Sequence, residues 1–194
     1  RDTIPPVVLG LYYKLIPENS ISGSNSSFNE LKLKKISNNL FISDTLKSNG
    51  PVGFGINSFD RMNNTWNKMG LSNIKTSIDG NEIFNMDLNS FSYDEWRHIN
   101  TFIDYPYYKN NKIKIQKLYI EKFNPLDMYK RSLGDGVVKI NETNVTYLYS
   151  VKLFDFNKNQ SEILVPIQWV KQNDLSTRKL DFDNMFKVNK DSTY

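Results

Sequence analysis

The chain has 194 residues, of which 39% are hydrophobic and 24% charged, and its formal net charge at pH 7 is +4. It contains no Cys and a single His, which excludes disulfides, thiolate nucleophiles and any zinc site that needs two imidazoles from these residues. The basic residues are scattered, which does not indicate nucleic-acid binding, and no apolar run approaches the roughly 18 residues of a membrane span.

Short runs of β-branched and aromatic residues, separated by clusters of Gly, Asn, Asp and Ser, predict that the chain is mainly β. The pair Asp79-Gly80 suits the positive φ angles of a type I′ turn and predicts a tight hairpin. So many short strands favour an Ig-like antiparallel β-sandwich. The predicted strands are Val7–Leu15, Leu31–Lys35, Asn39–Ile42, Val52–Asp60, Asn73–Ile78, Glu82–Leu88, Lys112–Glu121, Gly136–Ile140, Thr146–Phe154 and Ser161–Trp169.

One segment has helical rather than strand spacing. Ser92 and Glu95 form a capping box, with Ser at the N-cap and Glu three positions later. Apolar residues then follow at helical intervals until Pro106, which is expected to end the helix. We therefore predict one inserted α-helix over about Tyr93–Asp104, lying against or across a sheet edge.

The length suits one large domain, with or without an attached segment. We assign residues 1–170 to the β-sandwich domain. The composition becomes polar and charged after Trp169, so residues 171–194 are expected to be a polar tail or the start of a further module. Residues 19–29 are rich in Ser and Asn and predict a long surface loop. Because the chain opens at Arg1 rather than Met, we expect a mature or excised piece without its signal sequence.

Acidic residues and the lone imidazole of the predicted helix do not form a catalytic set. Asp94 and Glu95 would project about 100° apart, so they cannot flank one glycosidic bond, and we interpret them as first-turn and capping residues. His98 lies within reach of Glu95, but a Glu-x-x-His metal pair requires a second such pair, which this sequence lacks. No catalytic, cofactor-binding or metal-binding residue is assigned.

A turn-forming segment resembles the beginning of a calcium loop. Asp155-x-Asn157-x-Asn159 places oxygen ligands at alternate positions but lacks the later Gly and Glu of an EF-hand. Asp and Asn also suit a hairpin turn, which is the favoured interpretation. The alternative is a site of oxygen ligands that includes Asp60.

Aromatic residues gather around Pro106. Tyr105, Tyr107 and Tyr108 could form a platform for a carbohydrate or another partner, because an exposed ring offers an apolar face with a polar tip. Tyr also fills the cores and ordinary surfaces of β-sandwiches. Both interpretations stay open, and these three residues are the candidate ligand or partner surface.

The order of several segments resembles the β-sandwich region that follows the catalytic domain in lysostaphin-type zinc metallopeptidases of flavobacterial envelopes. The resemblance covers about residues 2–168. Its segments are Asp2-Thr-Ile-Pro-Pro-Val-Val, Val52-Gly-Phe-Gly-Ile-Asn-Ser-Phe-Asp60, Phe91-Ser-Tyr-Asp-Glu-Trp-Arg-His-Ile-Asn100, Ile103-Asp-Tyr-Pro, Ile115-Gln-Lys-Leu-Tyr, Asp135-Gly-Val-Val and Lys152-Leu-Phe-Asp-Phe-Asn-Lys-Asn159.

The resemblance implies a non-catalytic accessory domain in the periplasm or at the outer membrane. It would position an upstream peptidase on peptidoglycan or dock it to an envelope protein. The family's zinc ligands lie in a His-x-x-x-Asp segment and a His-x-His pair, and this sequence, with only His98, matches neither. Zinc is therefore expected only in the catalytic domain. The alternatives are a protein-interaction subunit of an outer-membrane assembly and a module that binds glycan or peptidoglycan; neither nucleic acid nor a transmembrane segment is expected.

Overall fold

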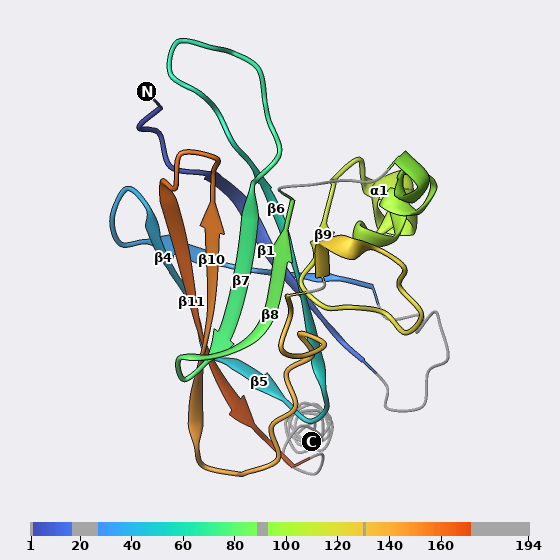
Figure 1. Ribbon diagram of the computed structural model, residues 1–194. Coiled ribbons are helices and arrows are strands. Elements are labelled where there is room, and N and C mark those ends of the chain that lie inside the picture. Colours follow the sequence, from blue (N-terminus) through green and yellow to red (C-terminus); the bar gives the residue numbers. More distant parts are fainter. Residues whose placement is uncertain (1, 17–26, 89–92, 130, 172–194) are drawn as a thin grey trace, which may run out of the picture.

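Two β-sheets face each other across a hydrophobic core in the computed structural model, which describes residues 2–16, 27–88, 93–129 and 131–171 (Figure 1). Within these residues one sheet has the order β2-β1-β6-β9 and the other has the order β3-β4-β11-β10-β7-β8, with β5 also paired to β11. The predicted β-sandwich with one α-helix is therefore confirmed. The strands of the first sheet are β1 (Val7–Leu15), β2 (Asn29–Leu31), β6 (Val52–Phe59) and β9 (Gln116–Lys117). Those of the second are β3 (Leu33–Lys35), β4 (Leu40–Ser43), β5 (Leu46–Ser48), β7 (Asn73–Ile78), β8 (Asn81–Asp87), β10 (Thr146–Phe154) and β11 (Gln160–Trp169).

Strand pairing is antiparallel except at β11, where β4 and then β5 pair in parallel. The predicted antiparallel arrangement therefore does not extend to the pairing of β11 with these two strands. Residues 40–48 run alongside β11 in the same direction, and the chain then passes to β6 in the other sheet. This segment therefore joins the two layers.

Several predicted elements are confirmed at both ends, namely β1, β7 and β10. The hairpin between β7 and β8 also turns as predicted, because Asp79 and Gly80 have φ angles of 47° and 83°. β7 and β10 each have one face in the core, which produces the alternation that the sequence displays, whereas β1 is buried on both faces around Leu11 and Tyr12.

Two predicted strands are largely absent from the described structure. Only Gln116 and Lys117 of Lys112–Glu121 form a strand, and Gly136–Ile140 contributes a single bridge from Val138 to Val52. Residues 115–119 are buried without alternation, because they lie beneath neighbouring segments on one side and against β6 on the other. The sequence also gave no signal for β5, whose single apolar residue is Leu46.

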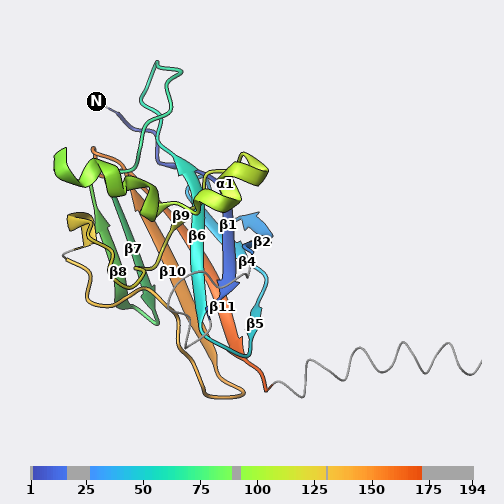
Figure 2. The same cartoon turned by 90° about the vertical axis from the view of Figure 1, so that its right-hand side faces the viewer.

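Helical structure is present where a helix was predicted, but of another type. Residues Tyr93–Phe102 form a 3-10 helix, η1, and the α-helix α1 covers Tyr105–Asn111 (Figure 2). The expectation that Pro106 ends the helix is wrong, because Pro106 occupies the first turn of α1, where its missing N–H costs nothing. Ser92 of the predicted capping box lies outside the described residues. A short 3-10 helix, η2, follows at Asp127–Tyr129.

The core between the sheets includes a stacked pair of rings. Phe54 of β6 lies against Tyr149 of β10, with ring centroids 4.2 Å apart and an interplanar angle of 15°. A smaller cluster of Tyr12, Phe28, Ile115 and Tyr119 covers the outer face of the first sheet. α1 packs onto this cluster, and so the outer face of the four-stranded sheet carries the helix (Figure 2).

Close packing explains the Gly-Phe-Gly sequence of β6. A Cβ atom on Gly55 would lie 2.4 Å from Cγ2 of Ile115, and one on Gly53 would lie 2.4 Å from Cδ1 of Ile16. Only glycine leaves room for the small cluster to lie directly on the strand. Among the described residues, no helix is long and apolar enough to cross a membrane.

Candidate functional site

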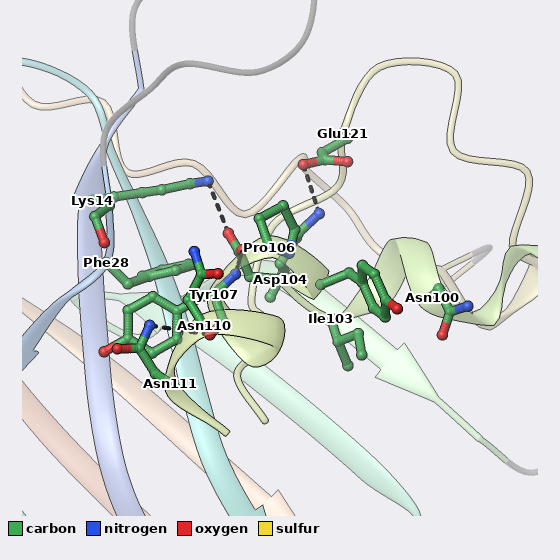
Figure 3. Close-up of a pocket in the computed structure, with 13 residues that line it drawn as sticks. Lys14, Phe28, Asn100, Ile103, Asp104, Pro106, Tyr107, Asn110, Asn111 and Glu121 are labelled. Atoms are coloured by element: carbon green, nitrogen blue, oxygen red, sulfur yellow. Dashed lines mark hydrogen bonds and ion pairs between the residues drawn. The ribbon is translucent and has the colours of Figure 1, made fainter. Parts of the chain in front are cut away.

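A pocket of about 530 Å³ lies between α1 and the outer face of the four-stranded sheet (Figure 3). It combines aromatic rings with amide and charged side chains. Its lining residues are Lys14, Ser27, Phe28, Asn100, Ile103, Asp104, Tyr105, Pro106, Tyr107, Asn110, Asn111, Lys117 and Glu121.

Asp104 organises one side of this pocket. Its Oδ1 accepts a hydrogen bond from the backbone N–H of Tyr107 at 2.9 Å and so caps α1. Its Oδ2 lies 3.5 Å from Nζ of Lys14, which reaches across from β1 (Figure 3). The Lys14 ammonium also lies 4.9 Å from the ring centroid of Phe28. One carboxylate therefore joins the sheet to the beginning of the helix.

A second ion pair forms the other side. Nζ of Lys117 donates to Oε1 of Glu121 at 2.7 Å and to the backbone carbonyl of Thr101 at 3.2 Å. The Lys117 side chain is buried, whereas the Glu121 side chain is about half exposed. Each lysine of the pocket thus lies beside a carboxylate, so the pocket has little net charge.

The rim of the pocket carries exposed amides. Asn100, Asn110 and Asn111 all have exposed side chains, and Nδ2 of Asn111 donates to the backbone carbonyl of Tyr107 at 3.1 Å. An amide offers both donors and acceptors. The rim is therefore suited to hydrogen bonds with hydroxyl and amide groups of a ligand.

The predicted aromatic surface divides into two kinds of residue. Tyr107 is half-buried, and its ring meets those of Tyr12 and Phe28 edge-on, with centroids 6.0 and 6.4 Å apart. Tyr105 is 53% exposed and lines the pocket, whereas Tyr108 is exposed but is not among the lining residues. Tyr107 thus anchors α1, whereas the Tyr105 ring is exposed at the pocket.

The other residues weighed from the sequence lie apart from this pocket. His98 is exposed on η1. The Glu95 carboxylate accepts a hydrogen bond from the backbone N–H of Asp127, which ties η1 to η2. The pocket lining contains neither His nor Cys.

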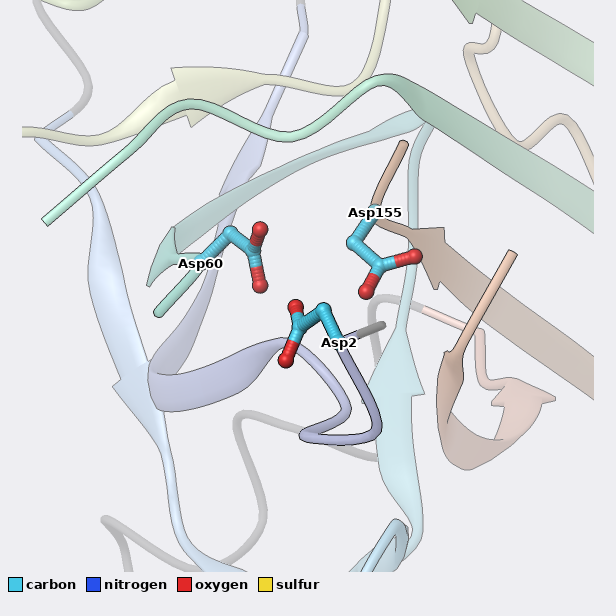
Figure 4. A group of neighbouring side chains, drawn as sticks. All are labelled: Asp2, Asp60 and Asp155. Atoms are coloured by element: carbon cyan, nitrogen blue, oxygen red, sulfur yellow. The ribbon is translucent and has the colours of Figure 1, made fainter. Parts of the chain in front are cut away.

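A separate group of carboxylates, which we call the acid cluster, lies at one end of the sandwich: Asp2, Asp60 and Asp155 (Figure 4). Asp60 follows β6 of one sheet, Asp155 follows β10 of the other, and Asp2 precedes β1. One carboxylate oxygen from each lies within 4.8 Å of the others. The side chains are 6%, 3% and 0% exposed, in that order, so all three carboxylates are shielded from water.

Local hydrogen bonds hold two members of the acid cluster. Oδ1 of Asp2 accepts from the backbone N–H groups of Ile4 and Asn63, both at 3.2 Å. Asp155 accepts from the backbone N–H of Asn159 at 2.8 Å and from its Nδ2 at 2.6 Å. Asn159 Nδ2 also donates to the backbone carbonyl of Asp2 at 3.2 Å, so one amide fixes both segments.

The structure thus brings together Asp60 and Asp155, which the alternative interpretation of the sequence places in one site of oxygen ligands. Asn159 positions the carboxylates through its amide, while Asn157 is exposed. Asp2 was not predicted as a ligand, because no residue spacing indicates where the segment before β1 lies. Burial, together with the charges of Asp155 and Asp2, raises the pKa of Asp60 above its ordinary value.

Comparisons of this chain with models of protein families, with curated proteins and with solved structures found no match.

Proposed function

We propose that this chain is a non-catalytic accessory β-sandwich domain that positions a lysostaphin-type peptidase on peptidoglycan, and that it holds the cell wall at the α1 pocket. The observation that carries the binding site is the pocket itself, where the exposed Tyr105 ring stands beside a rim of amides. The assignment to this class of peptidase is supported by the order of segments over about residues 2–168.

The chemistry of the pocket suits a fragment of glycan and peptide. An aromatic ring can stack on the apolar face of a sugar, and the rim amides can bond to its hydroxyls and to peptide groups. Lys14 and Lys117 are each held by a carboxylate, so the pocket does not concentrate positive charge as a phosphate site would. A ligand with many neutral polar groups therefore fits best.

The non-catalytic role rests on composition. A chain with no Cys and one His cannot supply the family's zinc ligands, and Gly-x-Ser-x-Gly is also missing from the sequence. We place the chemistry, and its zinc, in an upstream domain of the same protein. On this proposal the domain works in the cell envelope, in the periplasm or at the outer membrane.

The test is binding of the purified chain to isolated peptidoglycan sacculi in a sedimentation assay. We expect Tyr105→Ala combined with Asn110→Ala to reduce the bound fraction at least several-fold. Phe123→Ala is the matched control, because it removes an almost fully exposed ring outside the pocket. If the parent chain stays in the supernatant, or if the double variant binds as well as the parent, the proposed function is wrong.

A second candidate function is docking to an envelope protein through the loop between β6 and β7. Trp66 is 88% exposed there, and Met62 and Met69 are partly exposed on the same loop. Exposed apolar side chains of this kind favour a protein interface. A photo-crosslinking residue at position 66 tests this candidate in the native envelope. This candidate is supported if the crosslinker at position 66 gives a discrete adduct that is not formed when the crosslinker replaces Lys47. The same adducts from both positions count against it.

A further inference from the structure

We propose that Asp2, Asp60 and Asp155 bind one divalent cation of the hard, oxygen-preferring class, with Ca²⁺ as the favoured ion. This site is separate from the α1 pocket and does not depend on the proposed function. It would join the segment before β1, the end of β6 and the hairpin from β10 to β11 (Figure 4).

The spacing of the oxygens fits this ion. Ca²⁺ holds about six to eight oxygens at about 2.3–2.6 Å, so two oxygens on opposite sides of it are about 4.6–5.2 Å apart. One carboxylate oxygen from each member of the acid cluster lies within 4.8 Å of the other two, which is within the span of opposite Ca²⁺ ligands. Mg²⁺ is smaller, with opposite ligands about 4.0–4.2 Å apart, and accepts a narrower range of distances between its ligands.

The unpartnered oxygens of the acid cluster point to a ligand. Oδ1 of Asp60 and Oδ2 of Asp2 are buried and have no hydrogen-bond partner among the described residues. Their side chains are directed toward each other and toward Asp155 (Figure 4). A buried carboxylate oxygen without a partner is costly, and in folded proteins such a group is paired, protonated or coordinated to a metal. Ile4 and Asn63 occupy Oδ1 of Asp2 and leave its Oδ2 free, whereas both oxygens of Asp155 accept from Asn159.

No side chain of opposite charge neutralises the acid cluster within the described part of the chain. None of the ion pairs there includes Asp2, Asp60 or Asp155. Arg61, which directly follows Asp60, instead lies over the rings of Phe59 and Trp66, with its Cζ 5.8 Å from each centroid. Among the described residues, the buried charge is therefore left to be balanced by a bound cation or a retained proton.

The donor set selects the class of ion. All the candidate ligands are carboxylate oxygens, which suit Ca²⁺ and Mg²⁺, whereas zinc prefers nitrogen and sulfur donors. Ca²⁺ also tolerates irregular geometry and takes water for its remaining positions. The all-oxygen donor set and the irregular geometry that Ca²⁺ tolerates therefore favour Ca²⁺.

The experiment uses the 194-residue chain, stripped of metal with a chelator and then titrated with CaCl₂ by calorimetry. We expect one Ca²⁺ per chain, and a rise in Tm of about 3–6 °C when Ca²⁺ is present at about ten times its Kd. Asp60→Asn and Asp155→Asn should each abolish both effects. Asp44→Asn is the matched control, because it removes an exposed carboxylate that is paired only to Lys34; it should bind Ca²⁺ like the parent.

The melting temperature of Asp60→Asn in chelator measures the charge repulsion within the empty acid cluster. Because this variant lacks one buried charge, we expect it to melt in chelator at the same temperature as the parent or higher. If it fails to fold, the calorimetric titration of the parent decides the matter alone. The proposal is overturned if the parent binds no Ca²⁺, if Asp44→Asn loses the effect as well, or if Mg²⁺ raises Tm and Ca²⁺ does not.

Discussion

The ammonium of Lys14 lies 3.5 Å from the carboxylate of Asp104, so a cation on β1 holds the residue that caps α1. The same carboxylate accepts the backbone N–H of Tyr107. This side of the pocket therefore depends on two interactions of the Asp104 side chain, an ion pair with the sheet and a cap on the helix. The next two substitutions separate these interactions.

Asp104→Ala and Asp104→Asn should differ by about 1 kcal/mol in the free energy of unfolding. Both remove the charge that faces Lys14, but Asn retains an oxygen that can accept from Tyr107 N–H. Urea denaturation of the two variants measures the difference. Asp44→Asn, which breaks an exposed pair with Lys34, should change stability by no more than about 0.5 kcal/mol. Equal stability of the two Asp104 variants would show that the cap contributes nothing.

Gly55→Ala should destabilise the domain by about 1–3 kcal/mol, because the new methyl group would lie 2.4 Å from Cγ2 of Ile115. Adding Ile115→Ala should make the cost of Gly55→Ala much smaller, since it removes the atom that clashes. Gly70→Ala is the control, because no atom lies within 4 Å of its Cβ position. Denaturation midpoints of the four proteins complete the double-mutant cycle, and an additive result would contradict the packing explanation.

The sequence predicted the fold where one face of a strand is buried and the other is not. β7 and β10 show this alternation, and their ends, like those of β1, were predicted correctly. Prediction failed around Ile115, where consecutive residues are buried without alternation. It also failed at β5, because its three residues form a strand only by pairing with β11, which is distant in sequence. Pro106 misled because proline suits both the end of one helix and the first turn of the next.

The candidate sites were predictable in part for a similar reason. Asp60 and Asp155 each follow a strand, so a shared end of the sandwich was a reasonable alternative. Asp2 could not be placed, because the path of the segment before β1 depends on contacts with Asn63 and Asn159, which are distant in sequence. The tyrosines near Pro106 were found from composition, but their division between anchoring and exposure required the structure.

Tyr107→Ala should lower the stability of the domain, whereas Tyr105→Ala should lower its binding to sacculi and leave its stability almost unchanged. Tyr107 packs between Tyr12 and Phe28, so its loss should lower the free energy of unfolding by about 2–4 kcal/mol, less than for a fully buried ring. Tyr105 is exposed, so its loss should leave stability within about 0.5 kcal/mol while reducing sedimentation with sacculi. Thermal melts and the sedimentation assay on the same samples check both. A stable Tyr107→Ala variant would show that this ring does not anchor α1.

Asp60 should make stability depend on pH in the absence of metal. Its pKa is raised in the folded protein above the ordinary value of 3.8, by burial first and by the charges of Asp155 and Asp2. The folded state therefore holds the Asp60 proton more tightly than the unfolded chain does. The contribution of this group to stability is present at low pH and is lost as the pH rises through the folded-state pKa.

Thermal melts between about pH 4 and about pH 7, in chelator and in Ca²⁺, measure this dependence. In chelator, the stability of the parent relative to Asp60→Asn should fall as the pH rises, because only the parent develops the buried charge. In Ca²⁺ this fall should be reduced or reversed, since the ion binds the deprotonated carboxylates and its affinity increases with pH. Parallel pH profiles for the parent and Asp60→Asn in chelator would contradict this prediction. They would mean that the pKa of Asp60 is not raised by folding, and that the carboxylates of the acid cluster do not repel one another strongly enough for a cation to stabilise the fold.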